Sequence, residues 1–99
     1  MWCHLVLFKL KNFPDDEKVT IRQEIKSQLE KLPALIDELS DLEVGVNYEL
    51  EAKSFDIALI THFEKYEDIA VYQLHQEHLK VLDLISRSAV ERAAVDYEF

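Results

Sequence analysis

Residues 2–11, with the sequence WCHLVLFKLK, carry apolar side chains on both of the faces that an extended chain presents. Such a run of valine, leucine, phenylalanine and tryptophan favours a β-strand. Successive side chains of a strand point to opposite faces of its sheet. One face here would carry Trp2, His4, Val6, Phe8 and Leu10, and the other Cys3, Leu5 and Leu7. In a strand with one face in water, apolar residues would alternate with polar ones, so we expect both faces of this strand to be covered.

A helix is expected after this strand, beyond a break at Asn12-Phe13-Pro14. Asp15 is the expected N-cap, and further acidic residues follow it in the positively polarised first turn. Apolar residues then recur at i, i+4, i+8 and i+11, namely Ile21, Ile25, Leu29 and Leu32. This spacing predicts one buried helical stripe. Pro33 limits the regular helix, and residues 34–39 can add an irregular turn.

The middle of the chain predicts two strands joined by a turn. In residues 42–49, polar or small residues alternate with Leu42, Val44, Val46 and Tyr48. Residues 51–54 are the polar turn, and residues 55–63 form the third expected strand. One face of this strand holds Ala58 and Ile60, while the opposite face is also apolar. The third strand therefore resembles the first, because neither of its faces is suited to water.

A second helix and a fourth strand complete the predicted elements. The charged residues 64–68 lead into the helix, whose expected buried side comprises Ile69, Tyr72, Leu74, His75, Leu79, Leu82 and Ile85. Residues 86–88 can end it, and residues 90–99 predict the last strand. The order β-α-β-β-α-β is that of a split-βαβ plait, an α+β fold with two helices on one face of a four-stranded antiparallel sheet. Since the chain has 99 residues, we expect one domain, 1–99.

Two helices cover only one face of such a sheet, and the other face still carries Leu5, Leu7, Ala58 and Ile60. A large uncovered apolar face normally marks an interface. We therefore predict a homodimer in which two sheets pack face to face and bury about 1,600 Å2. The alternative is that loops or the C-terminal residues of the same chain cover this face, which the short loops disfavour.

The composition excludes several partners. Lysine and arginine number 11 and aspartate and glutamate 20, and the resulting net charge of −9 repels phosphate backbones, so no nucleic acid is expected. No apolar run approaches the ~18 residues of a membrane span. Cys3 is the only cysteine, which excludes an internal disulfide and a cysteine-built metal site. The first five residues lack the basic region and cleavage site of a signal peptide, so we expect a cytoplasmic protein.

Five short segments occur in an order that resembles the stress-responsive A/B barrel domain family, the dimeric α+β barrel or Dabb family. They are HLVLFKLK at 4–11, EVGVN at 43–47, FDIALI with FE at 55–60 and 63–64, YQLHQEH at 72–78, and VDY at 95–97. The resemblance covers nearly the whole chain. It implies a ferredoxin-like protomer and a sheet-to-sheet homodimer. It also implies a family whose biochemical functions are often unassigned, but which includes a plant polyketide cyclase that uses neither metal nor organic cofactor.

The second helix holds the candidate site. At about 100° per residue, Tyr72 and His78 lie about 120° apart around the axis with His75 between them, so all three can border one groove facing the sheet. His4 can point into the same groove from the first strand. An imidazole can take a proton from an activated carbon, and a tyrosine hydroxyl can hold the developing enolate oxygen. Resemblance to the cyclase makes His78 the catalytic base and Tyr72 the carbonyl-binding donor, with His4 and His75 as ligand-binding candidates.

The chain departs from the cyclase pattern at two positions. Ile57 stands where the cyclase has a further histidine, and Gln76 stands where the family has proline after its helix histidine. Each candidate also has a structural interpretation: His75 would bond a backbone carbonyl, and the others would pack in the core. His75 and His78 have a spacing that metal ligands use, but no third ligand is evident, so we expect no metal and no cofactor.

Three functions stay open from the sequence. The first is a homodimeric Dabb protein that binds a small apolar or aromatic molecule between its helices and its sheet. The second is a cofactor-independent cyclase, isomerase or lyase that uses His78 as base together with Tyr72. The third is a structural module with a filled core and no ligand site. A cavity between the second helix and the sheet would count against the third.

Overall fold

The computed structural model describes residues 1–49 and 54–99. Its β-strands are β1 (Trp2–Leu10), β2 (Asp41–Val46), β3 (Ile57–Phe63) and β4 (Ala89–Glu98). Its helices are α1 (Asp15–Glu30), the short 3-10 helix η1 (Leu32–Ala34), α2 (Tyr66–Leu74) and α3 (Gln76–Ser88). Except for Ser54, the polar turn expected at residues 51–54 lies outside the described residues. None of these helices is long and apolar enough to cross a membrane.

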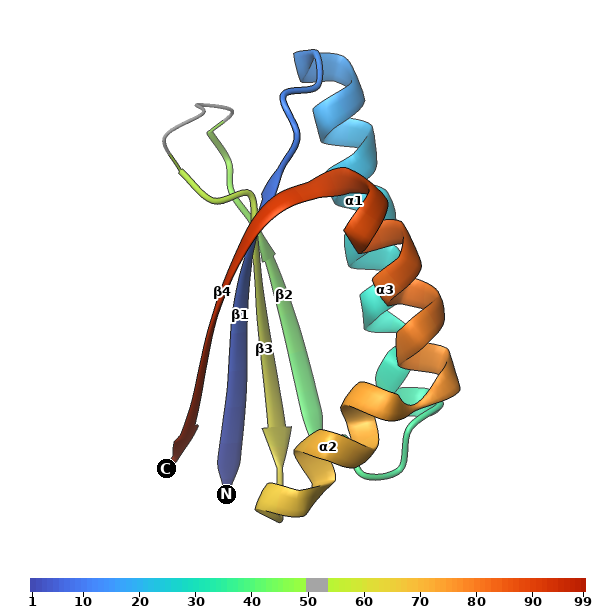
Figure 1. Cartoon of the computed structure of the whole chain (residues 1–99), viewed down its shortest axis with the longest axis vertical. Coiled ribbons are helices and arrows are strands. Elements are labelled where there is room, and N and C mark those ends of the chain that lie inside the picture. Colours follow the sequence, from blue (N-terminus) through green and yellow to red (C-terminus); the bar gives the residue numbers. More distant parts are fainter. Residues whose placement is uncertain (50–53) are drawn as a thin grey trace.

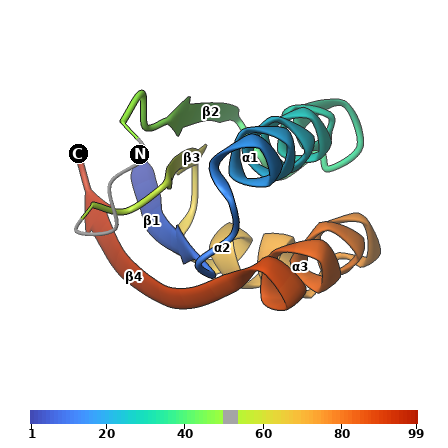
Figure 2. The same ribbon diagram turned by 90° about the horizontal axis from the view of Figure 1, so that it is seen from above.

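The four strands form one antiparallel sheet in the order β2-β3-β1-β4. All three α-helices lie on the same side of this sheet (Figure 1). Seen from above, the helices make a second layer, and β4 curves toward α3 (Figure 2). The predicted α+β plait is therefore confirmed, with its second helix divided into α2 and α3.

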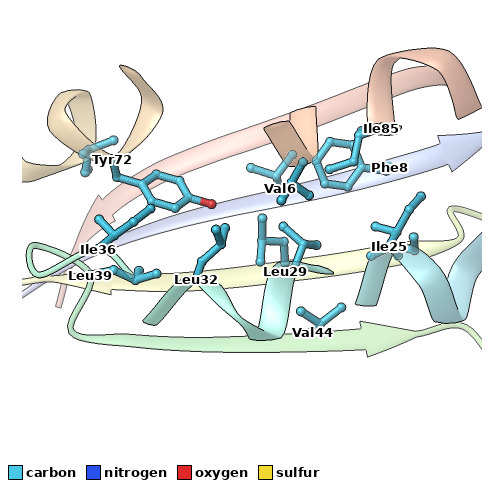
Figure 3. Packing of buried hydrophobic residues seen from close by; sticks show 14 of the residues in the cluster. Val6, Phe8, Ile25, Leu29, Leu32, Ile36, Leu39, Val44, Tyr72 and Ile85 are labelled. Carbon is cyan, nitrogen blue, oxygen red and sulfur yellow. The ribbon is translucent and has the colours of Figure 1, made fainter. Parts of the chain in front are cut away.

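The hydrophobic core lies between the helices and the sheet. From β1, the even-numbered Val6, Phe8 and Leu10 are buried, and they are packed in one cluster with Ile25 and Leu29 of α1 (Figure 3). Burying one such side chain contributes roughly 1.5–3 kcal/mol. The predicted stripe of α1 is thus confirmed in its centre, although its first member, Ile21, is only partly buried.

The start of α1 differs from the expectation by one residue. Pro14, and not Asp15, is the N-cap, and its carbonyl accepts from the Lys18 backbone N–H at 2.9 Å. The proline ring fixes φ near −65° and so prepares the chain to enter a helix. Asp15 is already helical and lies with Asp16 and Glu17 in the first turn, where a carboxylate is stabilised by the helix dipole.

The expected second helix breaks at His75. Its backbone is extended there (φ −65°, ψ 137°), so α2 ends at Leu74 and α3 begins at Gln76. The His75 ring stabilises the break, because its Nδ1 accepts from the Glu77 backbone N–H at 3.1 Å. The prediction of one continuous buried side is therefore wrong: Leu74 is 76% exposed, and Leu79 and Leu82 are also exposed.

A buried ion cluster joins α1 to the sheet. The Asp56 carboxylate accepts from the Leu10 backbone N–H at 2.7 Å and from Arg22 Nε at 3.1 Å, and Lys18 Nζ lies 3.9 Å away. Arg22 also donates to the carbonyl of Asn47 at 2.7 Å. Asp56 and Asn47 therefore organise the chain between β2 and β3.

These contacts also shorten the two strands relative to the prediction. Asn47 donates from its side chain to the Phe55 carbonyl at 2.9 Å, which makes a turn where strand pairing was expected. As a result, β2 ends at Val46, and β3 begins at Ile57 instead of at residue 55. Tyr48, expected within the second strand, is 91% exposed.

The sheet face opposite the helices carries the apolar residues that the sequence placed there. Leu5 is opposite Ile60 of β3 and Val95 of β4, and Leu7 is opposite Ala58 and Ala93. These side chains are only partly buried or exposed, and every described helix lies on the other face (Figure 2). We call this surface the open face; it is an apolar surface of the kind that marks interfaces.

Candidate functional site

A small enclosed cavity lies between the sheet and the helices α2 and α3. Its volume is about 50 Å3, the space of one or two water molecules. Its polar lining comes from four elements and comprises His4, Tyr72, Gln73, His78 and Arg92. The remaining lining is apolar and comprises Val6, Phe8, Leu59, Leu82 and Ile85. Three predicted site residues, His4, Tyr72 and His78, thus line one cavity.

A wider hollow adjoins this cavity. It has a volume of about 220 Å3 and lies between α3 and the first half of β4. The two spaces share Phe8, Leu82, Ile85 and Arg92 in their linings. Leu82, which is 39% exposed, lies in both linings. We call the cavity and the hollow together the α3 groove.

Tyr72 contributes a hydroxyl group to the cavity that lacks a partner. The residue is fully buried, and its ring centroid lies 5.4 Å from that of Phe63 and 4.4 Å from that of His78. Figure 3 shows the ring reaching from α2 across the sheet, with its hydroxyl toward the interior. Among the described residues, no group hydrogen-bonds this hydroxyl. Burial raises the pKa of Tyr72 above its ordinary value, so the hydroxyl keeps its proton and can donate it.

His78 is arranged to accept a proton. Its Nδ1 lies 3.1 Å from the Gln73 carbonyl oxygen. Because a carbonyl only accepts, Nδ1 carries the proton, and Nε2 of the neutral ring keeps a lone pair. Burial lowers the pKa of His78; the backbone hydrogen bond raises it, while the charges of His4 and Arg92 lower it further. The net lowering keeps His78 neutral at pH 7.

His4 is held by an acidic residue of the neighbouring strand. It is buried, and its Nδ1 pairs with the carboxylate of Asp96. The two residues are direct partners in the β1–β4 register, so their side chains lie on the same face. Asp96 accepts the Nδ1 proton, which fixes the orientation of the His4 ring.

Arg92 supplies a positive charge where the cavity meets the wider hollow. It is the β4 partner of Phe8 and therefore shares the helix-facing side of the sheet. Arg92 is exposed, and it makes no ion pair or side-chain hydrogen bond with another described residue.

His75 lies apart from the other candidates, because it is not in the lining of the cavity or of the hollow. Its Nδ1 accepts from a backbone N–H as the cap of α3, whereas we expected it to bond a carbonyl. The calculated spacing on one helix also fails for Tyr72 and His78, which belong to α2 and α3. Their rings meet because the chain turns at His75.

Sequence reasoning missed Asp96 and Arg92. Arg92 and Asp96 flank the apolar run Ala93-Ala94-Val95, and charges at the two ends of such a run are the signal that could have found them. Assigning their partners needs the β1–β4 register, which places Asp96 beside His4 and Arg92 beside Phe8. Within the described ranges, no three histidine, cysteine, aspartate or glutamate side chains are grouped to hold a metal.

A four-stranded antiparallel sheet with helices on one face and an apolar opposite face is typical of the dimeric ferredoxin-like class of proteins. Within that class, the stress responsive A/B barrel domain (Dabb) model matches residues 3–99. The chain belongs to the Dabb family, as its sequence segments predicted. No curated protein matches this chain.

Solved structures agree with this assignment. A dimeric protein of unknown function with a ferredoxin-like fold from Bacteroides fragilis is 35% identical, with a TM-score of 0.91 over 99% of this chain and 95% of that chain. A dimeric ferredoxin-like protein of unknown function from Thermobifida fusca is 26% identical, with a TM-score of 0.81 over 99% and 90%. A hydroxynitrile lyase from Passiflora edulis is 14% identical, with a TM-score of 0.76 over 97% and 90%, and shares the fold.

Proposed function

We propose that this protein is a sheet-to-sheet homodimer in which each protomer binds a small apolar or aromatic molecule in the α3 groove. The observation that carries the proposal is the buried Tyr72 hydroxyl, which lines the cavity without a hydrogen-bond partner among the described residues. A buried polar group left unsatisfied costs about 1–3 kcal/mol. A ligand carbonyl oxygen would supply the missing acceptor, so the site has a reason to tolerate this cost.

The size of the groove limits the ligand. The cavity of about 50 Å3 is smaller than the roughly 150 Å3 apolar cavity that binds benzene in an engineered protein. Together with the hollow of about 220 Å3, the space is large enough for one ring and a short chain. Binding would therefore displace the exposed Leu82 side chain, and the ring would lie against Phe8 and Ile85.

The dimer is supported by two independent observations. The open face is apolar at Leu5, Leu7 and Ile60, and no described helix covers it. The Bacteroides fragilis and Thermobifida fusca proteins, which share the fold, are described as dimeric. A cytoplasmic setting also remains a proposal, consistent with the buried free thiol of Cys3.

The ligand proposal is tested with 4-phenyl-2-butanone, a small aromatic ketone. Titration followed by NMR should shift the ring protons of His4 and His78, which line the same cavity as Tyr72. Tyr72→Phe removes the donor and should weaken binding about tenfold, the effect of one hydrogen bond. Tyr66→Phe, on an exposed ring of α2, is the matched control. Absence of binding, or shifts remote from the groove, would favour the structural module instead.

A second candidate function is cofactor-independent proton transfer, favoured by the tautomer of His78. Its Nε2 would take a proton from the carbon next to a carbonyl, while the electron pair moves to the carbonyl oxygen that Tyr72 holds by a hydrogen bond. Nε2 then returns a proton, either the one it took or one exchanged with solvent, to the carbon or to another position of the molecule. The lyase from Passiflora edulis supports only the suitability of the fold for such chemistry.

Deuterium exchange tests this second function without assuming the natural substrate. In D2O, the protein should accelerate exchange at the carbons flanking the carbonyl of 4-phenyl-2-butanone. His78→Gln keeps a side chain able to bond the Gln73 carbonyl but removes the base, so it should return exchange to the background rate. Equal exchange in the variant and the unaltered protein would end the assignment of His78 as base.

A further inference from the structure

We infer that the ligand of the α3 groove carries an anionic group, a carboxylate, which Arg92 binds where the cavity meets the hollow; this inference rests on the proposed function. Arg92 lines both spaces, so its guanidinium serves a ligand in either. Arginine matches a carboxylate in shape, because its planar fork can donate two parallel hydrogen bonds.

No acidic side chain among the described residues forms an ion pair with Arg92. Glu91, next to it, is the partner of Lys9 in the strand register and also lines the hollow. Val90 and Ala94, which share the face of Arg92, are uncharged. Asp96, farther along that face, is engaged by His4. On the facing helix, Asp83 pairs with Arg87 at 3.2 Å.

The overall charge of the chain makes the arginine in this groove informative. With a net charge of −9, the molecule as a whole repels an anion. In the lining of the cavity, however, the charged or titratable side chains are His4, Tyr72, His78 and Arg92, and none of them is a carboxylate. The hollow adds one carboxylate, that of Glu91, and the Asp96 carboxylate is paired with His4.

The positions of the donors define the ligand class. Arg92 would hold the carboxylate, Phe8, Leu82 and Ile85 would contact the apolar body, and the Tyr72 hydroxyl would reach an oxygen at the enclosed end. An aromatic or alkyl-substituted carboxylic acid with a second oxygen fits this order. An arginine that only protects the edge strand β4 from pairing would not discriminate between acids and neutral molecules.

The test compares 4-oxo-4-phenylbutanoate, which carries a carboxylate and a second oxygen, with the ketone 1-phenylpentane-1,4-dione, which has the same skeleton but no charge. The unaltered protein should bind the acid about tenfold more tightly than the ketone, and added salt should reduce the difference. Arg92→Gln should abolish this preference, so that the acid and the ketone bind with similar affinity. Arg87→Gln, at an exposed arginine of α3 outside both linings, should retain it.

Two outcomes separate this inference from the proposed function. If the ketone binds in the groove but the acid is not preferred, or if Arg92→Gln keeps the preference, the assignment of Arg92 is wrong and the proposed function stands. If neither compound binds in the groove, both are wrong.

Discussion

The buried Tyr72 hydroxyl should lower the stability of the ligand-free protein, and this cost can be measured. Tyr72→Phe removes a buried group without a partner and keeps the ring that packs against Phe63. We expect the ligand-free variant to be more stable by about 1 kcal/mol in urea unfolding. Tyr66→Phe, where the ring is exposed, should change stability little. A clear loss of stability in Tyr72→Phe would mean that the hydroxyl already has a partner.

The ion cluster around Asp56 predicts a large loss of stability when Asp56 is replaced. Asp56→Ala would leave the buried charges of Arg22 and Lys18 without their counter-ion and the Leu10 N–H without its acceptor. Loss of one partner of a buried pair costs about 3–5 kcal/mol, measured as the free energy of unfolding in urea. Asp37→Ala, at an exposed position, should stay within about 0.5 kcal/mol. Equal effects of the two substitutions would contradict the role of Asp56.

The lowered pKa of His78 predicts how stability depends on pH. The unfolded chain binds this proton at an ordinary pKa of about 6.5, and the folded chain binds it only at lower pH. Stability is therefore lost as pH falls through about 6.5 and levels off below the folded pKa. Thermal unfolding of His78→Gln should show a smaller loss over this range than the unaltered protein. Parallel curves for the two proteins would show that the pKa of His78 is not lowered by folding.

Three residues of the candidate site were predictable from the sequence alone. His4, Tyr72 and His78 were singled out because they are the titratable side chains of otherwise apolar segments, and the structure brings them to one cavity. Asp96 and Arg92 could not be assigned, since their roles depend on which strand lies beside β4. The burial of Asp56 could not be predicted from the sequence either, because its partners come from β1 and α1.

At the scale of elements, the break between α2 and α3 brings the site together. His75 leaves the helical conformation and caps α3 through the Glu77 N–H. His75→Ala should destabilise the protein by about 1 kcal/mol in urea unfolding, whereas His75→Ser, which restores a capping oxygen, should recover most of the loss. Equal losses in both variants would show that the ring acts by packing and not as a cap.

The strands and α1 were predicted closely, and the second helix was not. Alternating or continuous apolar residues mark the four strands at the sequence level, and the periodic stripe marks α1. The segment around His75 contains neither proline nor glycine, so no breaker signal indicated that it leaves the helix. The strand ends at Val46 and Ile57 were misplaced because Asn47 and Asp56 bond across the turn.

The whole molecule has two layers, a sheet and a layer of helices (Figure 2). Helices cover one side of the sheet, and the open face presents Leu5, Leu7, Ala58 and Ile60. This arrangement was predictable because alternation along β1 and β3 puts apolar residues on both faces. The Dabb family membership agrees with it, and proteins of the same fold are described as dimeric.

The proposed sheet-to-sheet dimer predicts that a charge introduced on the open face prevents association. Leu7 lies in the middle of the open face, between Ala58 and Ala93 in the strand register. Leu7→Glu would place two carboxylates in the apolar contact of a symmetric dimer, and such uncompensated burial is costly. Val19→Glu, at an exposed apolar residue of α1, is the matched control and should leave the assembly unchanged.

Sedimentation equilibrium at micromolar concentration tests the sheet-to-sheet dimer most directly. The unaltered protein and Val19→Glu should have twice the chain mass of 11.6 kDa, and Leu7→Glu should have the mass of a single folded chain, with its fold checked by circular dichroism. If the unaltered protein sediments as a monomer, or if Leu7→Glu remains a dimer, the open face is not covered by a second copy.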